Sequence, residues 1–272
     1  MRLFKTIFAL AAVTATAIAA ESCRGNKSQN DIEFETRVDS VGYMMPDFYG
    51  DTVYAAAKYS VVWPEKIGKE DFDALRDSLL SLTFATTDAT TFEDAARHYM
   101  LSVVREHSAE SDTTFAYSKV PYDTAANAER SNESYIISDV TLLTPKVLVV
   151  QVYNYTYCFG AAHGMNTTRY LNYSIAAHKL LNADNMFKPG NETAILDLIN
   201  ASAKEHYPEE GTLFPEPIGR IGDLQITEKD IVFVYQPYDV APYSTGVVSI
   251  PVSQYDLHRF FSPEVVETLS EL

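Results

Sequence analysis

The sequence predicts an α+β fold in which an antiparallel sheet packs against helices. Three observations predict it: apolar residues alternate along several segments, other segments carry apolar residues at helical spacing, and the helices stand between strands without a regular alternation. The chain has 272 residues, of which 46% are hydrophobic, and this is enough to bury a core. We expect a smaller N-terminal α+β subdomain over residues 51–133 and a larger C-terminal subdomain over residues 134–272.

The first 22 residues have the pattern of a signal peptide. Arg2 and Lys5 precede an apolar run at residues 7–20 that carries no charge. This run is short for a transmembrane helix, which needs about 20 residues. We therefore expect residues 1–22 to be removed and the mature chain to lie outside the cytoplasm.

Cys23 follows the apolar run within the stretch AESC. A cysteine at this place resembles the lipidated first residue of bacterial lipoproteins, which implies a membrane anchor through a lipid on Cys23. Cleavage after Ala19 or Ala20 is the alternative, and it leaves a secreted protein. Residues 23–50 are polar and are predicted to be a tether, so we expect a protein of the bacterial cell envelope.

The first subdomain is predicted to begin with a strand and two helices. Residues 52–63 are strand-like and end at Pro64, and a helix follows from about Lys69. Thr90 or Thr91 is a suitable N-cap for the second helix. The apolar stripes of the two helices are Phe72, Leu75, Leu79 and Leu82, and then Phe92, Ala95, Ala96, Tyr99, Met100, Val103 and Val104.

A polar stretch at residues 108–133 is predicted to be a loop with one short strand. Residues 134–143 and 146–159 are strand-like, and Thr144 and Pro145 between them indicate a hairpin. The second strand is apolar on both faces at its start and polar on one face at its end, so we expect it to run outward from the core. Its aromatic face comprises Val147, Val149, Tyr153, Tyr155, Tyr157 and Phe159.

The rest of the C-terminal subdomain alternates irregularly between strands and helices. Asn191 is a plausible N-cap for a helix, because its side-chain oxygen is able to accept from the first turn. The last residues of the chain have the pattern of helical turns. The elements that we expect are a strand at 168–175, a helix at 192–206, and strands at 222–227, 230–236 and 245–251.

The formal net charge of the chain is −16. Removal of residues 1–22 takes away Arg2, Lys5 and Glu21, which changes the charge to −17. Such an acidic protein repels phosphate backbones, so we do not expect nucleic acid as a partner. A cationic protein is attracted to it, although a solvated acidic surface is the more common explanation.

The chain has two cysteines, and it has none of the stretches GxSxG, HExxH, GxGxxG or a Walker loop. If Cys23 carries a lipid, Cys158 has no disulfide partner within the chain. Two cysteines also exclude a cysteine-based zinc cluster. We expect no cofactor and no metal. Seven Asn-x-Ser/Thr sequences occur, among them those at Asn132 and Asn172, and we attribute them to chance.

The stretch YCFGAAHGM at residues 157–165 raises three hypotheses for His163. A thiolate needs a base nearby, so His163 and Cys158 are a possible catalytic pair, although a lone cysteine in a strand is more often a small apolar residue. A metal site of His163 with Asp239 or with Glu residues is a second hypothesis. The third is structural: Gly160 and Gly164 permit unusual backbone angles, and His163 forms a hydrogen bond to the turn that they make.

The stretch YQPYDVAPYSTG at residues 235–246 is a second candidate site. Its prolines indicate an irregular, semi-rigid loop after an apolar strand. Tyrosines on such a loop are able to stack on sugar rings or to contact a protein. Packing of the rings back against the sheet is an equal alternative.

The stretches YNYTYCFGAAHG, NADNMFKPGN and YQPYDVAPYSTGVVSIPVSQYDL occur in this order. Together they resemble the extracytoplasmic domain of RsiV-type anti-sigma factors that sense lysozyme, a domain that also occurs beside the catalytic domain of some peptidoglycan deacetylases. The resemblance covers residues 134–260 well and residues 50–110 more weakly. Ala161 stands where the family usually has the second glycine of GGAHG.

The resemblance implies a sensor-like or binding module without the sigma-binding segment or the deacetylase domain. We expect a non-enzymatic lipoprotein that recognises a cell-wall glycan or a cationic wall-attacking protein such as lysozyme. The alternatives are a hydrolase or deacetylase that acts on peptidoglycan, and a purely structural envelope protein. The residues expected at a ligand-binding site are Tyr157, His163, Tyr238, Asp239 and Tyr243, and none is expected to be catalytic.

Overall fold

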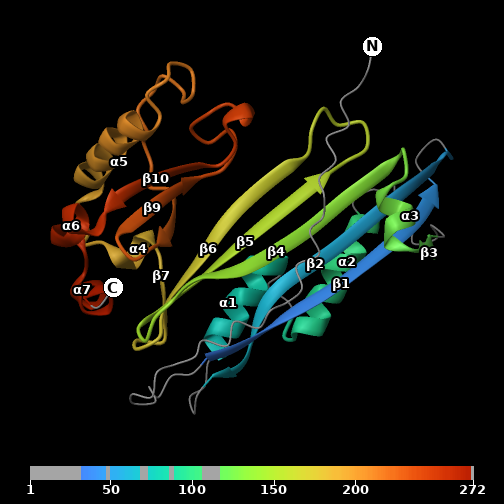
Figure 1. The fold of residues 1–272 in the computed structure, drawn as a ribbon, viewed down its shortest axis with the longest axis horizontal. Helices are drawn as coiled ribbons and strands as arrows, with labels where there is room; N and C mark the ends of the chain where they lie inside the picture. Colours follow the sequence, from blue (N-terminus) through green and yellow to red (C-terminus); the bar gives the residue numbers. More distant parts are fainter. Residues whose placement is uncertain (1–31, 47–49, 68–72, 86–88, 106–116, 271–272) are drawn as a thin grey trace, which may run out of the picture.

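The computed structural model describes residues 32–46, 50–67, 73–85, 89–105 and 117–270. The predicted signal peptide and Cys23 lie outside the described residues. Two sheets are present: a large one with the strand order β3-β1-β2-β4-β5-β6-β7, and a small one with the order β10-β9-β8 (Figure 1). The large sheet is mostly antiparallel and packs with helices, so the predicted α+β fold class is confirmed.

The first two strands form a long antiparallel pair, β1 (Ile32–Pro46) and β2 (Thr52–Ile67). Residues 32–46 belong to the predicted tether, and for them that prediction was wrong. Most of β1 is an outer strand, since β3 covers only its residues 42–44, and its exposed charged residues hide the alternation that marks a strand. β2 continues past Pro64, where the sequence predicts its end. The pairing with β1 has a β-bulge next to Pro64, between Glu33 and Phe34, and a bulge accommodates a proline.

Helices α1 (Asp73–Phe84) and α2 (Phe92–Arg105) cover one face of the large sheet (Figure 1). The predicted cap of α2 is confirmed, because Thr91 Oγ1 accepts from the Asp94 amide at 3.2 Å. Aromatic rings fill the core beneath these helices, with Trp63 and Phe92 at 5.1 Å between centroids. The opposite face of the sheet carries Tyr135 of β4 and Tyr153, Tyr155 and Tyr157 of β5.

The segment predicted to be a loop contains β3 (Ser118–Val120) and α3 (Tyr122–Ala126), and β4 (Ser131–Leu143) begins within it. The short strand is confirmed. The helix was not predicted, because five residues are too few to show a period. β4 pairs with β2 in parallel, so the boundary proposed between residues 133 and 134 falls inside a strand of one continuous sheet. No local pattern reveals a parallel pairing across so many residues.

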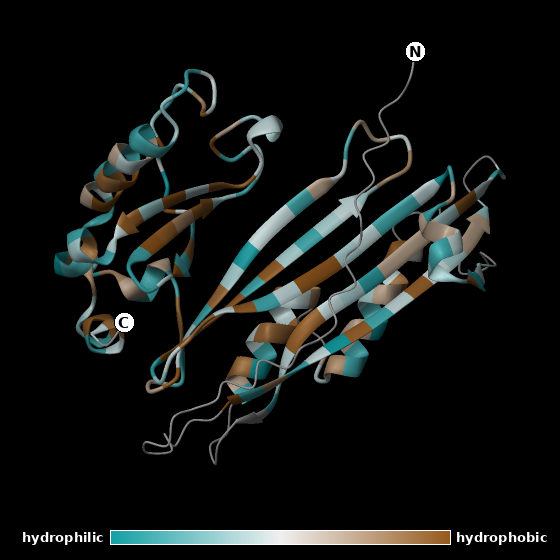
Figure 2. Ribbon diagram, viewed as in Figure 1, coloured by the Kyte–Doolittle hydropathy of each residue, from teal (hydrophilic) through white to brown (hydrophobic). Residues whose placement is uncertain are grey.

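The predicted hairpin is confirmed by β5 (Val147–Tyr157), which pairs with β4 and then with β6 (Met165–Ser174). The start of β5 is buried on both faces, because Val147 and Val149 belong to one core and Leu148 and Val150 to the other. Its outer half is less buried and less apolar (Figure 2). The strand therefore runs outward from the core as the sequence predicts. β7 (Lys179–Leu181) pairs with the end of β6.

The small sheet and its helices form the C-terminal part of the molecule (Figure 1). The predicted helix and the three predicted strands are confirmed, with small differences at their ends. Asn191 stands at the N-cap position as predicted, but its side chain makes no capping bond, and its Nδ2 donates to the Lys188 and Pro189 carbonyls. The elements are α4 (Ala183–Met186), α5 (Glu192–His206), β8 (Asp223–Ile226), β9 (Asp230–Tyr235), η1 (Tyr243–Thr245), β10 (Val248–Ser253), α6 (Gln254–Leu257), η2 (His258–Phe260) and α7 (Pro263–Leu269).

Asn172 of β6 joins the two sheets. Its Nδ2 donates to the Leu224 carbonyl at 2.7 Å, and its Oδ1 accepts from the Ile226 amide at 2.9 Å. The side chain thus binds two backbone groups of β8 that do not pair with β9. Asn172 is 3% exposed, which explains why its Asn-x-Ser sequence is not a surface feature.

Candidate functional site

The turn between β5 and β6 places His163 at the end of the hairpin. Gly160 has a φ of 86°, a backbone angle that favours glycine, and the Ala161 amide donates to the Cys158 carbonyl at 2.9 Å. Gly164 is required for a different reason from the one expected. The Tyr155 ring packs directly against the Gly164 backbone, and a Cβ atom on residue 164 would overlap this ring.

His163 stacks on Tyr243, with ring centroids 3.7 Å apart and planes at 19°. Its Nδ1 donates to the Gly164 carbonyl at 2.9 Å, because a carbonyl is only an acceptor. The Tyr243 hydroxyl donates to the same carbonyl. The Tyr238 hydroxyl lies 3.3 Å from His163 Nε2. We call His163, Tyr238 and Tyr243 the aromatic cluster.

The backbone at Tyr238 has an angle that is unusual for a large residue. Its φ is 73°, and the Asp239 amide donates to the Gln236 carbonyl at 3.0 Å. With Pro237 before it, Tyr238 stands at the position of a type II turn that glycine normally occupies. Tyr238 is 53% exposed, and the centre of its ring lies 5.7 Å from that of the Tyr243 ring. Such strain persists only where surrounding contacts hold it.

Gln236 attaches this loop to the large sheet. Its Nε2 donates to the Thr168 carbonyl at 2.6 Å, and its Oε1 accepts from the Thr168 amide at 2.9 Å. Asp239 reinforces the turn, because its Oδ2 accepts from the Gln236 amide at 2.9 Å and pairs with Arg220. No spacing in the sequence identifies Gln236, since its partner lies on a strand 68 residues away.

Further tyrosines lie on the face of the large sheet opposite α1 and α2, starting next to the aromatic cluster. The ring of Tyr155 stacks on that of Tyr135 at 4.9 Å between centroids. The ammonium group of Lys58 lies 5.2 Å from the centre of the Tyr135 ring. Burial and the charge of Glu133 raise the pKa of the Tyr155 phenol. Burial also raises the pKa of Glu133, and Lys58 opposes this shift.

The structure brings three of the five expected residues into contact. Asp239 lies beside them in the same turn, but its carboxylate faces Arg220 and the Gln236 amide. Tyr157 lies at the end of β5, opposite Glu133 in the register. Cys158 is exposed, so its expected role as a small buried apolar residue was wrong.

The chemistry available at the cluster is recognition by rings and hydroxyls. Both ring nitrogens of His163 already face a partner within the protein. Within the described ranges, no three His, Cys, Asp or Glu side chains are grouped so as to hold a metal ion. The same ranges contain no helix long and apolar enough to cross a membrane.

Comparison with protein families finds a match for the C-terminal part of the chain. Residues 184–255 match the family model described as "Protein of unknown function (DUF3298)". This segment includes Tyr238 and Tyr243, whereas His163 precedes it. A comparison with curated proteins finds no match.

Two crystal structures of DUF3298 family proteins share the fold. One, from Bacteroides fragilis, has a TM-score of 0.69 and 19% identity over 90% of this chain and 100% of its own. The other, from Pseudomonas aeruginosa, has a TM-score of 0.59 and 18% identity over 88% of this chain and 98% of its own. The chain therefore contains a segment that matches DUF3298 and has a fold that is similar to structures of that family.

Proposed function

We propose that the protein is a non-enzymatic, sensor-like lipoprotein of the bacterial envelope that binds a cationic wall-attacking protein through the aromatic cluster. Lysozyme is the ligand of this class to test first. The observation that carries the proposal is the exposed Tyr238, held in a strained turn next to the His163–Tyr243 stack. The resemblance to lysozyme-sensing domains supports the choice of ligand, and two of the three stretches that carry it contain the residues of the aromatic cluster.

The hydrogen bonds of the cluster favour binding over catalysis. A general base needs a free nitrogen within reach of its substrate. Nδ1 of His163 is used by the Gly164 carbonyl, and Nε2 faces the Tyr238 hydroxyl. The surface that remains for a ligand is the exposed part of Tyr238 and of the half-buried Tyr243. Rigid tyrosines of this kind supply large contact area at a low entropic cost.

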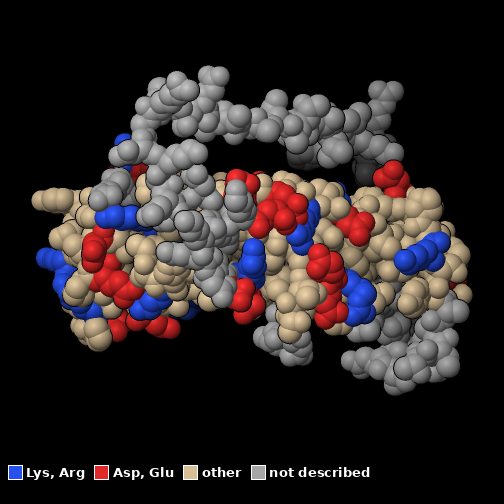
Figure 3. Space-filling view, turned by 90° about the horizontal axis from the view of Figure 1, so that it is seen from below, with Lys and Arg blue, Asp and Glu red and all other residues tan. Residues whose placement is uncertain are grey.

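Charge supports a cationic partner at long range. The formal net charge of −16 speeds the encounter with a basic protein at low salt. On the face shown in Figure 3, however, acidic side chains are interspersed with Lys and Arg. A contact with the aromatic cluster must therefore supply the specificity.

The envelope location rests on Cys23 and the apolar run before it. Growth of cells that produce the protein with labelled palmitate tests it. Label on the wild-type protein and its loss in Cys23→Ser support the lipid anchor. An unlabelled wild-type protein that is found in the medium contradicts it.

The first experiment is calorimetric titration of residues 24–272 with lysozyme at low and at high salt. We expect binding that weakens with salt but persists, because a shaped contact is less screened than free charges. Tyr238→Gly removes the ring and suits the positive φ, so it keeps the turn and lowers affinity at least about tenfold, as loss of a central tyrosine does. Tyr255→Ala is the matched control, because Tyr255 is 90% exposed.

Three outcomes contradict the proposal in different ways. Binding that disappears at high salt indicates charge attraction alone. The absence of binding at either salt directs the search to wall glycan fragments, which tyrosine rings also bind by stacking. Turnover of a wall substrate that His163→Ala abolishes without loss of stability identifies an enzyme instead.

A further inference from the structure

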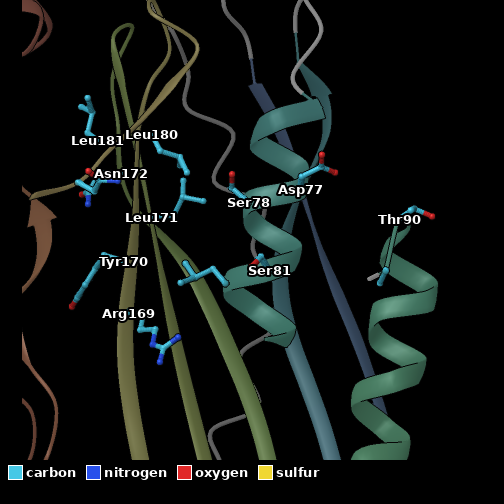
Figure 4. A pocket seen from close by; sticks show the side chains of 13 residues that line it. Asp77, Ser78, Ser81, Thr90, Arg169, Tyr170, Leu171, Asn172, Leu180 and Leu181 are labelled. Atoms are coloured by element: carbon cyan, nitrogen blue, oxygen red, sulfur yellow. The ribbon is translucent and has the colours of Figure 1, made fainter. Parts of the chain in front are cut away.

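A cleft of about 660 Å³ lies between α1 and the outer edge of β6, away from the aromatic cluster (Figure 4). This volume is typical of sites for small ligands. A second cavity of about 450 Å³ shares Leu82, Arg169 and Tyr170 with it and extends toward the Gln236 turn. The two cavities therefore follow the same strand edge.

The side chains of the cleft divide into an apolar part and a polar part. Leu171 and Leu180 point from the sheet toward α1 (Figure 4), and Leu82 of α1 completes the apolar part. Ser78 and Ser81 add hydroxyl groups on the helix side. The Ser78 hydroxyl donates to the Ala74 carbonyl at 2.6 Å and still has lone pairs for a ligand.

Among the described residues that line the cleft, Arg169 is the only one with a cationic side chain. It is exposed and points toward α1 (Figure 4). Among the described residues it has no ion-pair partner, although the protein is strongly acidic. The acidic residue of the cleft, Asp77, points away from β6 (Figure 4). An unpaired guanidinium group next to an apolar surface suits a carboxylate that carries an apolar group.

The edge of β6 supplies backbone groups beside Arg169. The amide and carbonyl of Thr168 both point outward, because Gln236 binds them. Alternation along an antiparallel strand directs those of Tyr170 to the same side. No described strand covers this position, since β7 pairs only with residues 172–174. An extended peptide is therefore able to bind at Tyr170 through its main chain.

We propose that this cleft binds a short peptide with a free C-terminal carboxylate. The carboxylate pairs with Arg169, an apolar side chain contacts Leu82, Leu171 and Leu180, and the main chain bonds to Tyr170 at the strand edge. This site is separate from the aromatic cluster and goes beyond the proposed function.

Calorimetry of the full mature chain with two probes tests the proposal. The probes are acetyl-Ala-Leu-Ala with a free carboxylate and the same peptide as its C-terminal amide. We expect the carboxylate form to bind at least about tenfold more tightly, which is the value of a hydrogen bond to a charged group. The long-range field of an acidic protein acts in the opposite direction, so this preference reports a local cation.

Three variants assign the binding to the cleft. Arg169→Gln removes the preference for the carboxylate and leaves binding of the amide unchanged. Ser81→Phe fills the cleft from an exposed position and weakens both peptides. Arg259→Gln is the matched control, because Arg259 lies on η2 against Phe260 and outside the cleft, and it changes neither affinity.

The proposal is overturned if neither peptide binds, if the amide binds as tightly as the acid, or if Arg169→Gln binds both as the wild type does. Decanoate that binds more tightly than the peptide shows a lipid site and also overturns it. The lysozyme titration distinguishes the two sites. Arg169→Gln leaves that titration unchanged, and Tyr238→Gly leaves peptide binding unchanged.

Discussion

At the scale of single residues, Gly164 allows the Tyr155 ring to pack against the turn that carries His163. A Cβ at this position would overlap the Tyr155 ring, which itself stacks on Tyr135. Gly164→Ala is therefore expected to lower the free energy of unfolding by about 1–3 kcal/mol, as overpacking does. Urea denaturation measures this change. Gly219→Ala is the control, because a Cβ there meets nothing within 4 Å, and an equal loss in both variants would contradict the packing argument.

Glu133 gives a prediction about pH. Its pKa is raised by burial, so between the unfolded value of about 4.3 and the raised value the folded protein binds more protons than the unfolded one. Glu133 therefore makes stability fall as pH rises through this window. Glu133→Gln is expected to reduce that fall. Urea denaturation between pH 4 and pH 7 measures it, with Glu129→Gln at an exposed position as the control. A variant whose stability falls as steeply as that of the wild type contradicts the role of Glu133.

The residues of the site differ in how far the sequence predicts them. His163, Tyr238 and Tyr243 stand in stretches that are unusual in composition, and the structure brings them together. Gln236 and Asn172 belong to no sequence pattern that indicates their hydrogen-bonding role. Their importance comes from backbone groups on other elements, and such long-range partners leave no trace in local composition.

At the scale of elements, Gln236 attaches the loop of residues 236–246 to β6. Gln236→Ala leaves the Thr168 amide and carbonyl without this partner. We expect amides of residues 237–246 to exchange with deuterium at least about fivefold faster, because a lost hydrogen bond of about 1 kcal/mol opens the loop. Hydrogen-exchange mass spectrometry measures this. Gln254→Ala removes a bond to Thr227 and serves as the control. Unchanged exchange in the 237–246 loop of Gln236→Ala would show that other contacts hold the loop.

Elements whose apolar residues recur at a regular helical or strand spacing were predicted well, and elements without such a spacing were not. α2 and α5 carry clear apolar stripes, and the structure confirms both. β1 is mostly an outer strand with exposed charges, and α3 has one turn and a half. The order of strands in the large sheet depends on the parallel pairing of β2 with β4. Such pairing is decided by the packing of whole elements, so the sequence pattern alone leaves it open.

At the scale of the whole molecule, β5 and β6 belong to both cores. Val149 packs in the core of the small sheet, and Val150 packs in the core under α1 and α2. Asn172 adds hydrogen bonds between the sheets. Loss of either core thus exposes apolar residues of the shared strands, and we expect the two parts to unfold as one cooperative unit.

Trp63 makes this expectation measurable, since it is the only tryptophan and lies in the core of the large sheet. Ile250→Ala creates a cavity in the other core and is expected to cost about 2–5 kcal/mol. If the parts are coupled, the urea midpoint from Trp63 fluorescence falls together with that from far-UV circular dichroism. Ser249→Ala on the exposed face of the same strand leaves both midpoints in place. A Trp63 transition that stays at the wild-type midpoint in Ile250→Ala would show that the small sheet unfolds independently, and that Asn172 and the shared strands do not couple the two cores.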